Sequence, residues 1–373
     1  MSQSLFCDEV LPHISDIQVY QPGKPISEVQ REHNLLRISK LASNENPLGA
    51  SPKAIKAVQS ELINMGRYPD GNSFYLKQDL ADFLQKQPTE IALGNGSNEL
   101  LELVARIFAG KGDEIIYSQY AFAVYSISTQ AVGATGIEVP AKEWGHDLEA
   151  MAEAITDKTK LIYLANPNNP TGTLFTQKEW EAFISKVPSN VIVVLDEAYT
   201  EYVTHDEYAN GLNYLEQYPN LIVSRTFSKA YGLAALRIGY MVANEELIAY
   251  INRLRAPFNI NHLAQVAAKA ALKDPMFVKK TVDLNTQGMQ TLTQFFEEKG
   301  LSYIPSQGNF VCVNLGPDSL KINQALLKEG VIVRPVAPEG KFSEFLRISI
   351  GLPNENQHFM AALNKILTSS NFK

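Results

Sequence analysis

Hydrophobic residues in the first two thirds of the chain gather in short, largely unbroken runs, and segments with helical periodicity separate them. The runs lie at residues 91–93, 114–117, 161–164, 191–195, 221–223 and 237–242. A strand that is apolar on both faces is typical of a parallel sheet covered by helices. The pattern therefore predicts an α/β domain with a mainly parallel sheet flanked by helices.

Helix-start signals occur between these runs, where such a fold needs them. Ser51 precedes Pro52, which places a capping side chain before a proline at the first helical position. Thr176, followed by Glu179, matches the capping-box pattern. Ser73 is expected to open a further helix. These signals predict three helices, each beginning just after its capping residue.

The pattern changes after Pro257. Long helical segments extend to about residue 299, and a last helix is expected from Asn354. Short strands are expected between them at residues 309–313, 331–333 and 345–349. This alternation of short strands and helices predicts a smaller α+β domain at the C-terminus.

The first 35 residues mix proline, glycine and charge without sustained periodicity. We therefore expect an N-terminal arm there, extended around residues 20–25. The predicted division of the chain is an arm at 1–35, a large domain at 36–258 and a small domain at 259–373. The small domain is discontinuous if the arm joins it.

Composition and charge exclude several classes of function. The 373 residues are 45% hydrophobic and 20% charged, which is the balance of a soluble globular protein with a sizeable core. The chain has 33 Lys and Arg residues against 40 Asp and Glu residues, and its net charge of −7 disfavours binding to nucleic acid or to an anionic membrane. No apolar run approaches the roughly 20 residues that span a bilayer.

Cysteine and histidine usage narrows the location and the chemistry. Cys7 and Cys312 are too few for a disulfide framework, and the N-terminus lacks the pattern of a secretory signal, so we expect a cytoplasmic protein. The six histidines never occur at metal-ligand spacing, so no metal is expected. An enzyme, a binding protein and a regulator all stay possible on these grounds.

Polar residues directly follow three of the apolar runs, at the edge of the sheet where parallel strands end. They are Asn169 in Asn-Pro-Thr-Gly, Asp196 with Tyr199 one helical turn on, and Lys229. Each has an ordinary interpretation, as a turn, a helix cap and a solvated lysine. A buried carboxylate is costly without a partner, however, and a desolvated lysine has the lowered pKa that Schiff-base chemistry needs.

Residues suited to a phosphate occur at two further places in the chain. Ser97 and Asn98 follow a strand in a glycine-rich turn and open a helix, where backbone amides bind anions. Ser228 and Arg237 flank the lysine. Glu99 would sit awkwardly beside a bound phosphate unless it turns away.

Taken jointly, these residues specify one cofactor. Lys229 would condense with a carbonyl group, and Asp196 would face a cationic ring nitrogen. Asn169 and Tyr199 would hold a ring oxygen. Pyridoxal 5′-phosphate (PLP) carries all of these groups together with a phosphate, and it is the predicted cofactor.

The sequence resembles the fold-type I, class II aminotransferases, which depend on PLP. The resemblance rests on Asn169, Asp196, Lys229 and Arg237 at the family's spacings, and on Arg347 in Phe-Leu-Arg-Ile-Ser. It covers nearly the whole chain from about Ile17. It implies a large domain with a mainly parallel sheet of the seven-stranded type, flanked by helices, and a smaller α+β C-terminal domain.

The resemblance also implies a role for each candidate residue. Lys229 would carry the cofactor and move the proton, and Asp196 would keep the ring nitrogen protonated. Phe122 would stack on the cofactor ring, with Tyr120 as its rival. The other cofactor contacts would be Ser97, Asn98, Asn169, Tyr199, Ser228 and Arg237. The substrate contacts would be Arg347, Arg334, Tyr20 and Asn309. Tyr68 would come from a second subunit, which implies a homodimer with shared active sites.

Several segments resemble, more narrowly, the histidinol-phosphate aminotransferase subgroup: residues 20–25, 41–49 and 67–70, and the pair Arg334 and Arg347. The expected reaction is transamination between L-histidinol phosphate and 2-oxoglutarate, giving imidazole-acetol phosphate and L-glutamate, in histidine biosynthesis. An aromatic-amino-acid aminotransferase is the nearest alternative, because it shares several of these segments. A decarboxylase of a phosphorylated amino acid, a non-catalytic PLP-binding regulator and an NAD-dependent dehydrogenase are the further alternatives.

Overall fold

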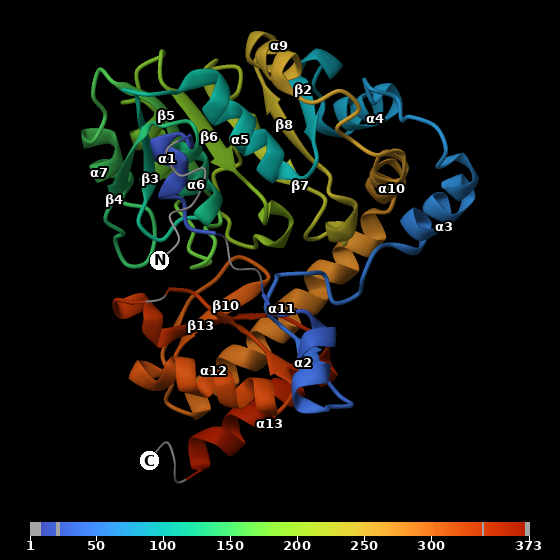
Figure 1. Ribbon diagram of the computed structural model, residues 1–373, viewed down its shortest axis with the longest axis vertical. Coiled ribbons are helices and arrows are strands. Elements are labelled where there is room, and N and C mark those ends of the chain that lie inside the picture. Colours follow the sequence, from blue (N-terminus) through green and yellow to red (C-terminus); the bar gives the residue numbers. More distant parts are fainter. Residues whose placement is uncertain (1–8, 20–22, 338, 370–373) are drawn as a thin grey trace.

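The computed structural model describes residues 9–19, 23–337 and 339–369. Its larger part is built on a seven-stranded sheet and its smaller part on a four-stranded sheet. The long helix α11 (Pro275–Glu298) runs from one part into the other (Figure 1). The predicted α/β class with a smaller α+β unit is confirmed. No helix within the described ranges is long and apolar enough to cross a membrane.

The seven-stranded sheet has the order β2-β8-β7-β6-β5-β3-β4. Its strands are β2 (Ile91–Gly94), β3 (Glu114–Ser118), β4 (Thr135–Val139), β5 (Thr159–Ala165), β6 (Ile192–Asp196), β7 (Leu221–Thr226) and β8 (Gly239–Ala243). Only β8 runs antiparallel to its neighbours, β2 and β7, and the other pairs are parallel. The prediction of a mainly parallel sheet therefore holds. β4 was not expected, because it is a mostly exposed edge strand without an apolar run.

The central strands are buried on both faces, as their unbroken apolar runs require. Ile162 and Leu164 of β5 belong to the core on one side of the sheet, whereas Leu161 and Tyr163 belong to the core on the other. Alternate residues of a strand point to opposite faces, so one run supplies both cores. Burying each large apolar side chain contributes about 1.5–3 kcal/mol to folding, which makes this sheet a rigid base for the residues at its edge.

Helices cover both faces of the sheet. One face packs against α5 (Ser97–Phe108), α6 (Ala123–Ala131) and α9 (Glu245–Leu254). The other packs against α3 (Pro52–Glu61), α4 (Phe74–Leu84), α7 (Leu148–Glu153), α8 (Gln177–Ile184) and α10 (His262–Leu272). The capping predictions hold: the Ser51 side chain accepts a hydrogen bond from the Ala54 amide, and Thr176 and Glu179 cap each other's backbone amides. Ser73 precedes α4, but its side chain makes no capping hydrogen bond.

The smaller part is an antiparallel sheet in the order β12-β13-β10-β9, with helices packed on it. Its elements are β9 (Tyr303–Ile304), β10 (Phe310–Asn314), α12 (Ser319–Lys328), β12 (Arg334–Pro335), β13 (Phe345–Ser349) and α13 (Pro353–Thr368). A second, parallel pair joins β1 (Ser39–Lys40) to β11 (Val331–Ile332), so residues near the start of the chain lie beside its C-terminal part.

The N-terminal region differs from the expected extended arm, because it contains α1 (Pro12–Ser15) and α2 (Ile26–His33). Val29 of α2 is fully buried against Ala42 and Ile332, and α2 lies beside the smaller part in Figure 1. The predicted extended stretch falls largely on residues 20–22, which lie outside the described residues.

The domain boundaries stay a prediction. We propose that α10, which packs on α3 and α4, belongs with the large domain and that α2 and β1 belong with the small one.

Candidate active site

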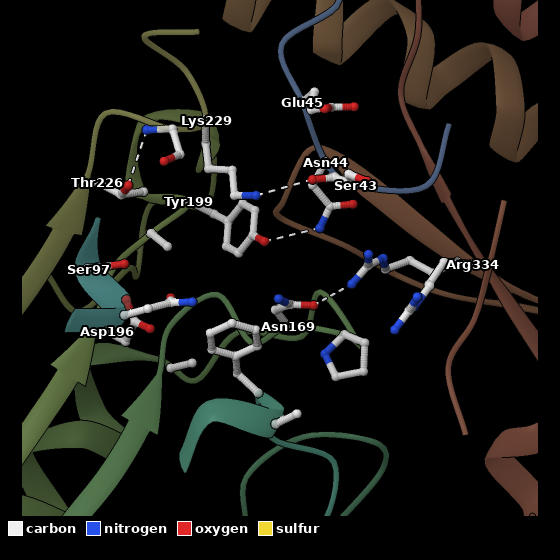
Figure 2. A pocket seen from close by; sticks show the side chains of 18 of the residues that line it. Ser43, Asn44, Glu45, Ser97, Asn169, Asp196, Tyr199, Thr226, Lys229 and Arg334 are labelled. Carbon is white, nitrogen blue, oxygen red and sulfur yellow. Dashed lines mark hydrogen bonds between the residues drawn. The ribbon is translucent and has the colours of Figure 1, made fainter. Parts of the chain in front are cut away.

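A pocket of about 380 Å³ lies where β5, β6 and β7 end, between the larger and the smaller part. Strand ends of the large sheet form one wall, and residues from the segment 42–45 and from the small sheet close the other. Figure 2 shows Asp196, Tyr199 and Lys229 on one side of this pocket and Arg334 across from them. The pocket brings together these predicted site residues: Ser97, Asn98, Phe122, Asn169, Asp196, Tyr199, Ser228, Lys229, Arg237, Arg334 and Arg347.

The amine of Lys229 projects into this pocket, and its Nζ donates a hydrogen bond to the Ser43 carbonyl at 3.3 Å (Figure 2). Burial, together with the positive charges of Arg347 and Arg237, lowers the pKa of this amine to about 8, against the opposing effect of Glu45 and Asp196. A substantial fraction of the amine is therefore neutral near physiological pH. A neutral, buried amine is the nucleophile that Schiff-base chemistry needs.

Asp196 ends β6 and is only 5% exposed. Its Oδ2 accepts a hydrogen bond from the Tyr125 hydroxyl at 3.0 Å, whereas its Oδ1 has no hydrogen-bond partner within the described residues. Burial raises the pKa of this carboxyl to about 6, and the hydrogen bonds from Tyr125 and the Ala198 backbone oppose that rise. A buried oxygen without a partner inside a pocket fits a ligand that brings a cationic hydrogen-bond donor, such as a pyridinium nitrogen.

Hydrogen bonds from neighbouring side chains hold Tyr199 and Asn169 in place. The Asn44 Nδ2 donates to the Tyr199 hydroxyl at 3.0 Å (Figure 2). The Arg347 Nη1 donates to the Asn169 Oδ1 at 2.6 Å. Because its Oδ1 is engaged by the guanidinium, the Asn169 amide keeps its NH₂ group as a donor on its other side. Asn169 and Tyr199 therefore suit the ring oxygen that the sequence assigned to them.

The start of α5 and Arg237 form the part of the pocket that suits a phosphate. Gly96 precedes the helix with φ +79°, and a Cβ at this position would collide with the Arg237 guanidinium. Arg237 in turn donates to the Ser228 hydroxyl at 3.4 Å. Glu99 turns away from the site, because its carboxylate accepts hydrogen bonds from the Asn95 amide and from Asn259 at 2.6 and 2.7 Å. A helix start with a guanidinium beside it and no opposing carboxylate fits an anion.

The two candidates for the ring that stacks on the cofactor, Phe122 and Tyr120, lie in different surroundings. Phe122 lines the pocket directly before α6. Tyr120 does not line it and packs instead against Trp144 and Phe342, with ring centroids 5.5 and 4.7 Å away. We therefore propose Phe122 as the ring that stacks on the cofactor.

Two of the predicted residues that the structure describes do not line the pocket, Tyr68 and Asn309. Tyr68 is 83% exposed, stacks on Phe258 at 4.8 Å and lines a separate groove beside α10. Asn309 is buried behind the wall, where its Nδ2 donates to the Asn44 carbonyl at 3.0 Å. Tyr20 lies outside the described residues.

The sequence did not predict two residues that contact the site, Tyr125 and Asn44. Tyr125 contacts Asp196 from a position 71 residues earlier, and Asn44 contacts Tyr199 from a position 155 residues earlier. Tyr125 is a phenol in an otherwise small or apolar helix start, and a buried phenol needs a polar partner. That is the one signal in the sequence that points to it.

A family model described as aminotransferase class I and II matches residues 37–363. The chain belongs to this family. It is 52% identical to histidinol-phosphate aminotransferase 1 of Idiomarina loihiensis, over 96% of this chain and 97% of the relative. It is 53% identical to histidinol-phosphate aminotransferase 2 of Pseudomonas aeruginosa, over 95% and 97% of the two chains. The predicted family and subgroup are therefore confirmed.

A solved structure supports the same assignment. The histidinol-phosphate aminotransferase of Sinorhizobium meliloti, in complex with pyridoxal 5′-phosphate, superposes with a TM-score of 0.88 at 29% identity and covers 96% of this chain and 97% of its own. An aspartate aminotransferase double mutant of Thermus thermophilus superposes with a TM-score of 0.81 at 20% identity, which shows the shared fold. The predicted fold-type I architecture is confirmed by both.

Proposed function

We propose that this aminotransferase interconverts L-histidinol phosphate and 2-oxoglutarate with imidazole-acetol phosphate and L-glutamate, in histidine biosynthesis. The observation that carries the proposal is a pocket that holds a buried lysine amine, an unsatisfied carboxylate oxygen and three arginines. Relatives that bear the corresponding name match nearly the full length of the chain. PLP is the cofactor, as it is in the related complex.

PLP would be held by the residues that the pocket gathers. Its carbonyl would join the Lys229 amine and its ring nitrogen would face Asp196. Asn169 and Tyr199 would hold the ring oxygen, and Phe122 would pack on the ring. The phosphate contacts would be Ser97, Asn98, Ser228 and Arg237. When bound, PLP supplies a protonated ring that withdraws electrons from the reacting carbon of the substrate.

The proton transfer belongs to the Nζ of Lys229. With its amine free, Lys229 would take the proton from the substrate carbon at Nζ and give it up again on the cofactor side. A pKa of about 8 suits both the uptake and the release of the proton, because it lies near the working pH. The Ser43 carbonyl accepts a hydrogen bond from this amine at 3.3 Å and so helps to hold it in the pocket.

Arg334 and Arg347 would bind the anionic end of each substrate. They lie opposite each other on the paired strands β12 and β13, so both side chains belong to the same face of the small sheet. A guanidinium forms paired hydrogen bonds with a phosphate as readily as with a carboxylate. One pair of arginines can therefore serve histidinol phosphate in one half of the reaction and glutamate in the other.

We also propose that the protein is a cytoplasmic homodimer with shared active sites. Tyr68 and Tyr75 are exposed and line one groove beside α4 and α10, which shares no lining residue with the pocket that holds Lys229. An exposed aromatic pair of this kind is typical of an interface between subunits. Tyr68 would then complete the pocket of the partner subunit.

The two half-reactions test the proposed function. Holoenzyme mixed with histidinol phosphate alone, without 2-oxoglutarate, should release one equivalent of imidazole-acetol phosphate per active site and lose the visible absorbance of bound PLP. Addition of 2-oxoglutarate should restore the absorbance. Release of carbon dioxide from a phosphorylated amino acid, or a spectrum unchanged by amino donors, would point instead to a decarboxylase or to a non-catalytic regulator.

A further inference from the structure

Tyr125 lies beneath the pocket with no exposed surface and a fixed orientation. Its ring stacks on Tyr163 of β5 with centroids 4.7 Å apart and an angle of 4° between the ring planes. The Tyr163 hydroxyl is itself anchored to the Leu101 carbonyl at 2.7 Å. The Tyr125 hydroxyl therefore has little freedom to leave the Asp196 Oδ2, which it meets at 3.0 Å.

The two oxygens of Asp196 differ as a result. Oδ2 is engaged by Tyr125 from below, whereas Oδ1 has no partner within the described residues, and Asp196 lines the pocket. The backbone at this position is also held, because the Asp196 carbonyl accepts a hydrogen bond from the Asn166 amide at 3.0 Å. With the main chain and one oxygen fixed, the direction of the other oxygen is fixed as well.

The proton in this hydrogen bond belongs to the tyrosine. Burial and the nearby carboxylate raise the pKa of Tyr125 well above its usual value, so the phenol stays protonated and donates. A donor at Oδ2 favours the ionised form of Asp196, against the burial that favours the neutral acid. Lys229 and the Ala198 backbone also favour the ionised form, and Glu197 opposes it.

We propose that Tyr125 is a positioning residue that keeps Asp196 ionised and keeps its free oxygen directed at the ring nitrogen of the cofactor. The proposal rests on the proposed function, because only a cofactor with a basic ring nitrogen needs this carboxylate. Removal of the hydroxyl should then leave the pocket intact but bring a neutral carboxyl to the ring nitrogen over part of the working pH range. The ring would withdraw fewer electrons, and turnover would fall.

Two matched variants separate this role from a structural one. Tyr125→Phe removes the hydroxyl and keeps the stacked ring. Tyr163→Phe removes the other buried hydroxyl of the same ring pair, which contacts a backbone carbonyl and not Asp196. Both variants lose one buried hydrogen bond, so a general loss of packing or stability should affect them alike.

The decisive readout is the titration of Asp196 in the apoprotein, followed by carboxyl infrared difference spectra with Asp196→Asn as the reference. Tyr125→Phe should raise the pKa of Asp196 by about one unit, because the ionised form has lost a donor. In the holoenzyme, kcat should fall about twofold near pH 7 and by up to about tenfold at lower pH, and the fall should vanish as pH rises above the new pKa. KM should change less than kcat, and Tyr163→Phe should change neither the titration nor the pH profile.

A double-variant comparison keeps the proposal testable if Tyr125→Phe is less stable. In an Asp196→Asn background the Tyr125 substitution should cost no further activity, because its only target is already neutral. Equal effects of the two tyrosine variants on the Asp196 titration, or additive losses with Asp196→Asn, would overturn the proposal. Neither result depends on which amino donor the enzyme prefers. A failure of the Tyr125 proposal can therefore be distinguished from a failure of the substrate assignment.

Discussion

The amine of Lys229 lies among two guanidinium groups and two carboxylates whose charges act on it in opposite directions. Burial and Arg347 lower the pKa of the amine, Glu45 partly offsets them, and the net result is a value of about 8. The ordinary value for a lysine is about 10.4. At the scale of a single residue, this shift is what turns a common surface cation into a reactive amine.

The uptake of PLP by the apoprotein should therefore depend on pH in a specific way. The neutral amine is the reactive form, so the rate should fall roughly tenfold per pH unit below about pH 8 and level off above it. Stopped-flow absorbance of the apoprotein with PLP measures this rate. Nα-acetyl-lysine, which keeps a free side-chain amine, is the matched control, because its rate should continue to rise toward pH 10. A protein rate that follows the control would contradict the lowered pKa.

Residues next to a strand end could be identified from sequence, and their partners could not. Asp196 and Lys229 follow apolar runs, so the sheet itself brings them to one edge. Tyr125 and Asn44 meet their targets only through contacts that span 71 and 155 residues, which depend on how helices and loops pack. The same reason explains why Tyr120 and Phe122 stayed ambiguous until their surroundings were visible.

The start of α5 is the element on which phosphate binding depends. Gly96 lies there at φ +79° with the Arg237 guanidinium directly against it, so the glycine allows both the turn and the position of the arginine. Gly112 has a similar φ of +97°, but a Cβ there would meet open space. The two glycines therefore form a matched pair that separates backbone strain from displacement of Arg237.

Gly96→Ala should weaken PLP binding by about tenfold or more, because a displaced guanidinium loses charge-assisted hydrogen bonds to the phosphate. Gly112→Ala carries comparable backbone strain and should leave the affinity for PLP near that of the wild type. Fluorescence titration of both apoproteins with PLP measures the two dissociation constants. Equal affinities in the two variants would contradict the assignment of Gly96 and Arg237 to the phosphate site.

Elements with a clear apolar pattern were predictable, and elements stabilised by distant contacts were not. The buried strands β5, β6 and β7 carry unbroken apolar runs, which predict burial on both faces of the sheet. The edge strand β4 is mostly exposed and carries no such run. α2 has one buried residue, Val29, and its helical form became evident only from its contact with Ile332.

At the scale of the whole molecule, the pocket is closed by segments that lie far apart in the chain. Arg347 from the small sheet reaches Asn169 of the large part, and Asn309 holds the loop that carries Asn44. The sequence pattern could place these residues in separate domains, but it could not show that the two domains share one site. The resemblance to the family supplied that expectation.

If Tyr68 completes the pocket of a second subunit, two inactive variants should restore each other. Tyr68→Ala and Lys229→Ala, unfolded and refolded together in equal amounts, should regain about a quarter of the wild-type activity, since half of the dimers are mixed and each has one intact site. Lys229→Ala mixed with Asp196→Asn is the control, because both changes affect the pocket of their own chain. No recovery in the first mixture would place Tyr68 outside the active site.

The central claim is that this pocket serves histidinol phosphate. The measurement that tests it most directly is a comparison of kcat/KM for L-histidinol phosphate with the values for phenylalanine and tyrosine, with 2-oxoglutarate as the common acceptor. Arg334 and Arg347 favour a doubly charged phosphate end, so we predict a preference for histidinol phosphate of about a hundredfold or more. Equal values, or a preference for the aromatic amino acids, would contradict the account.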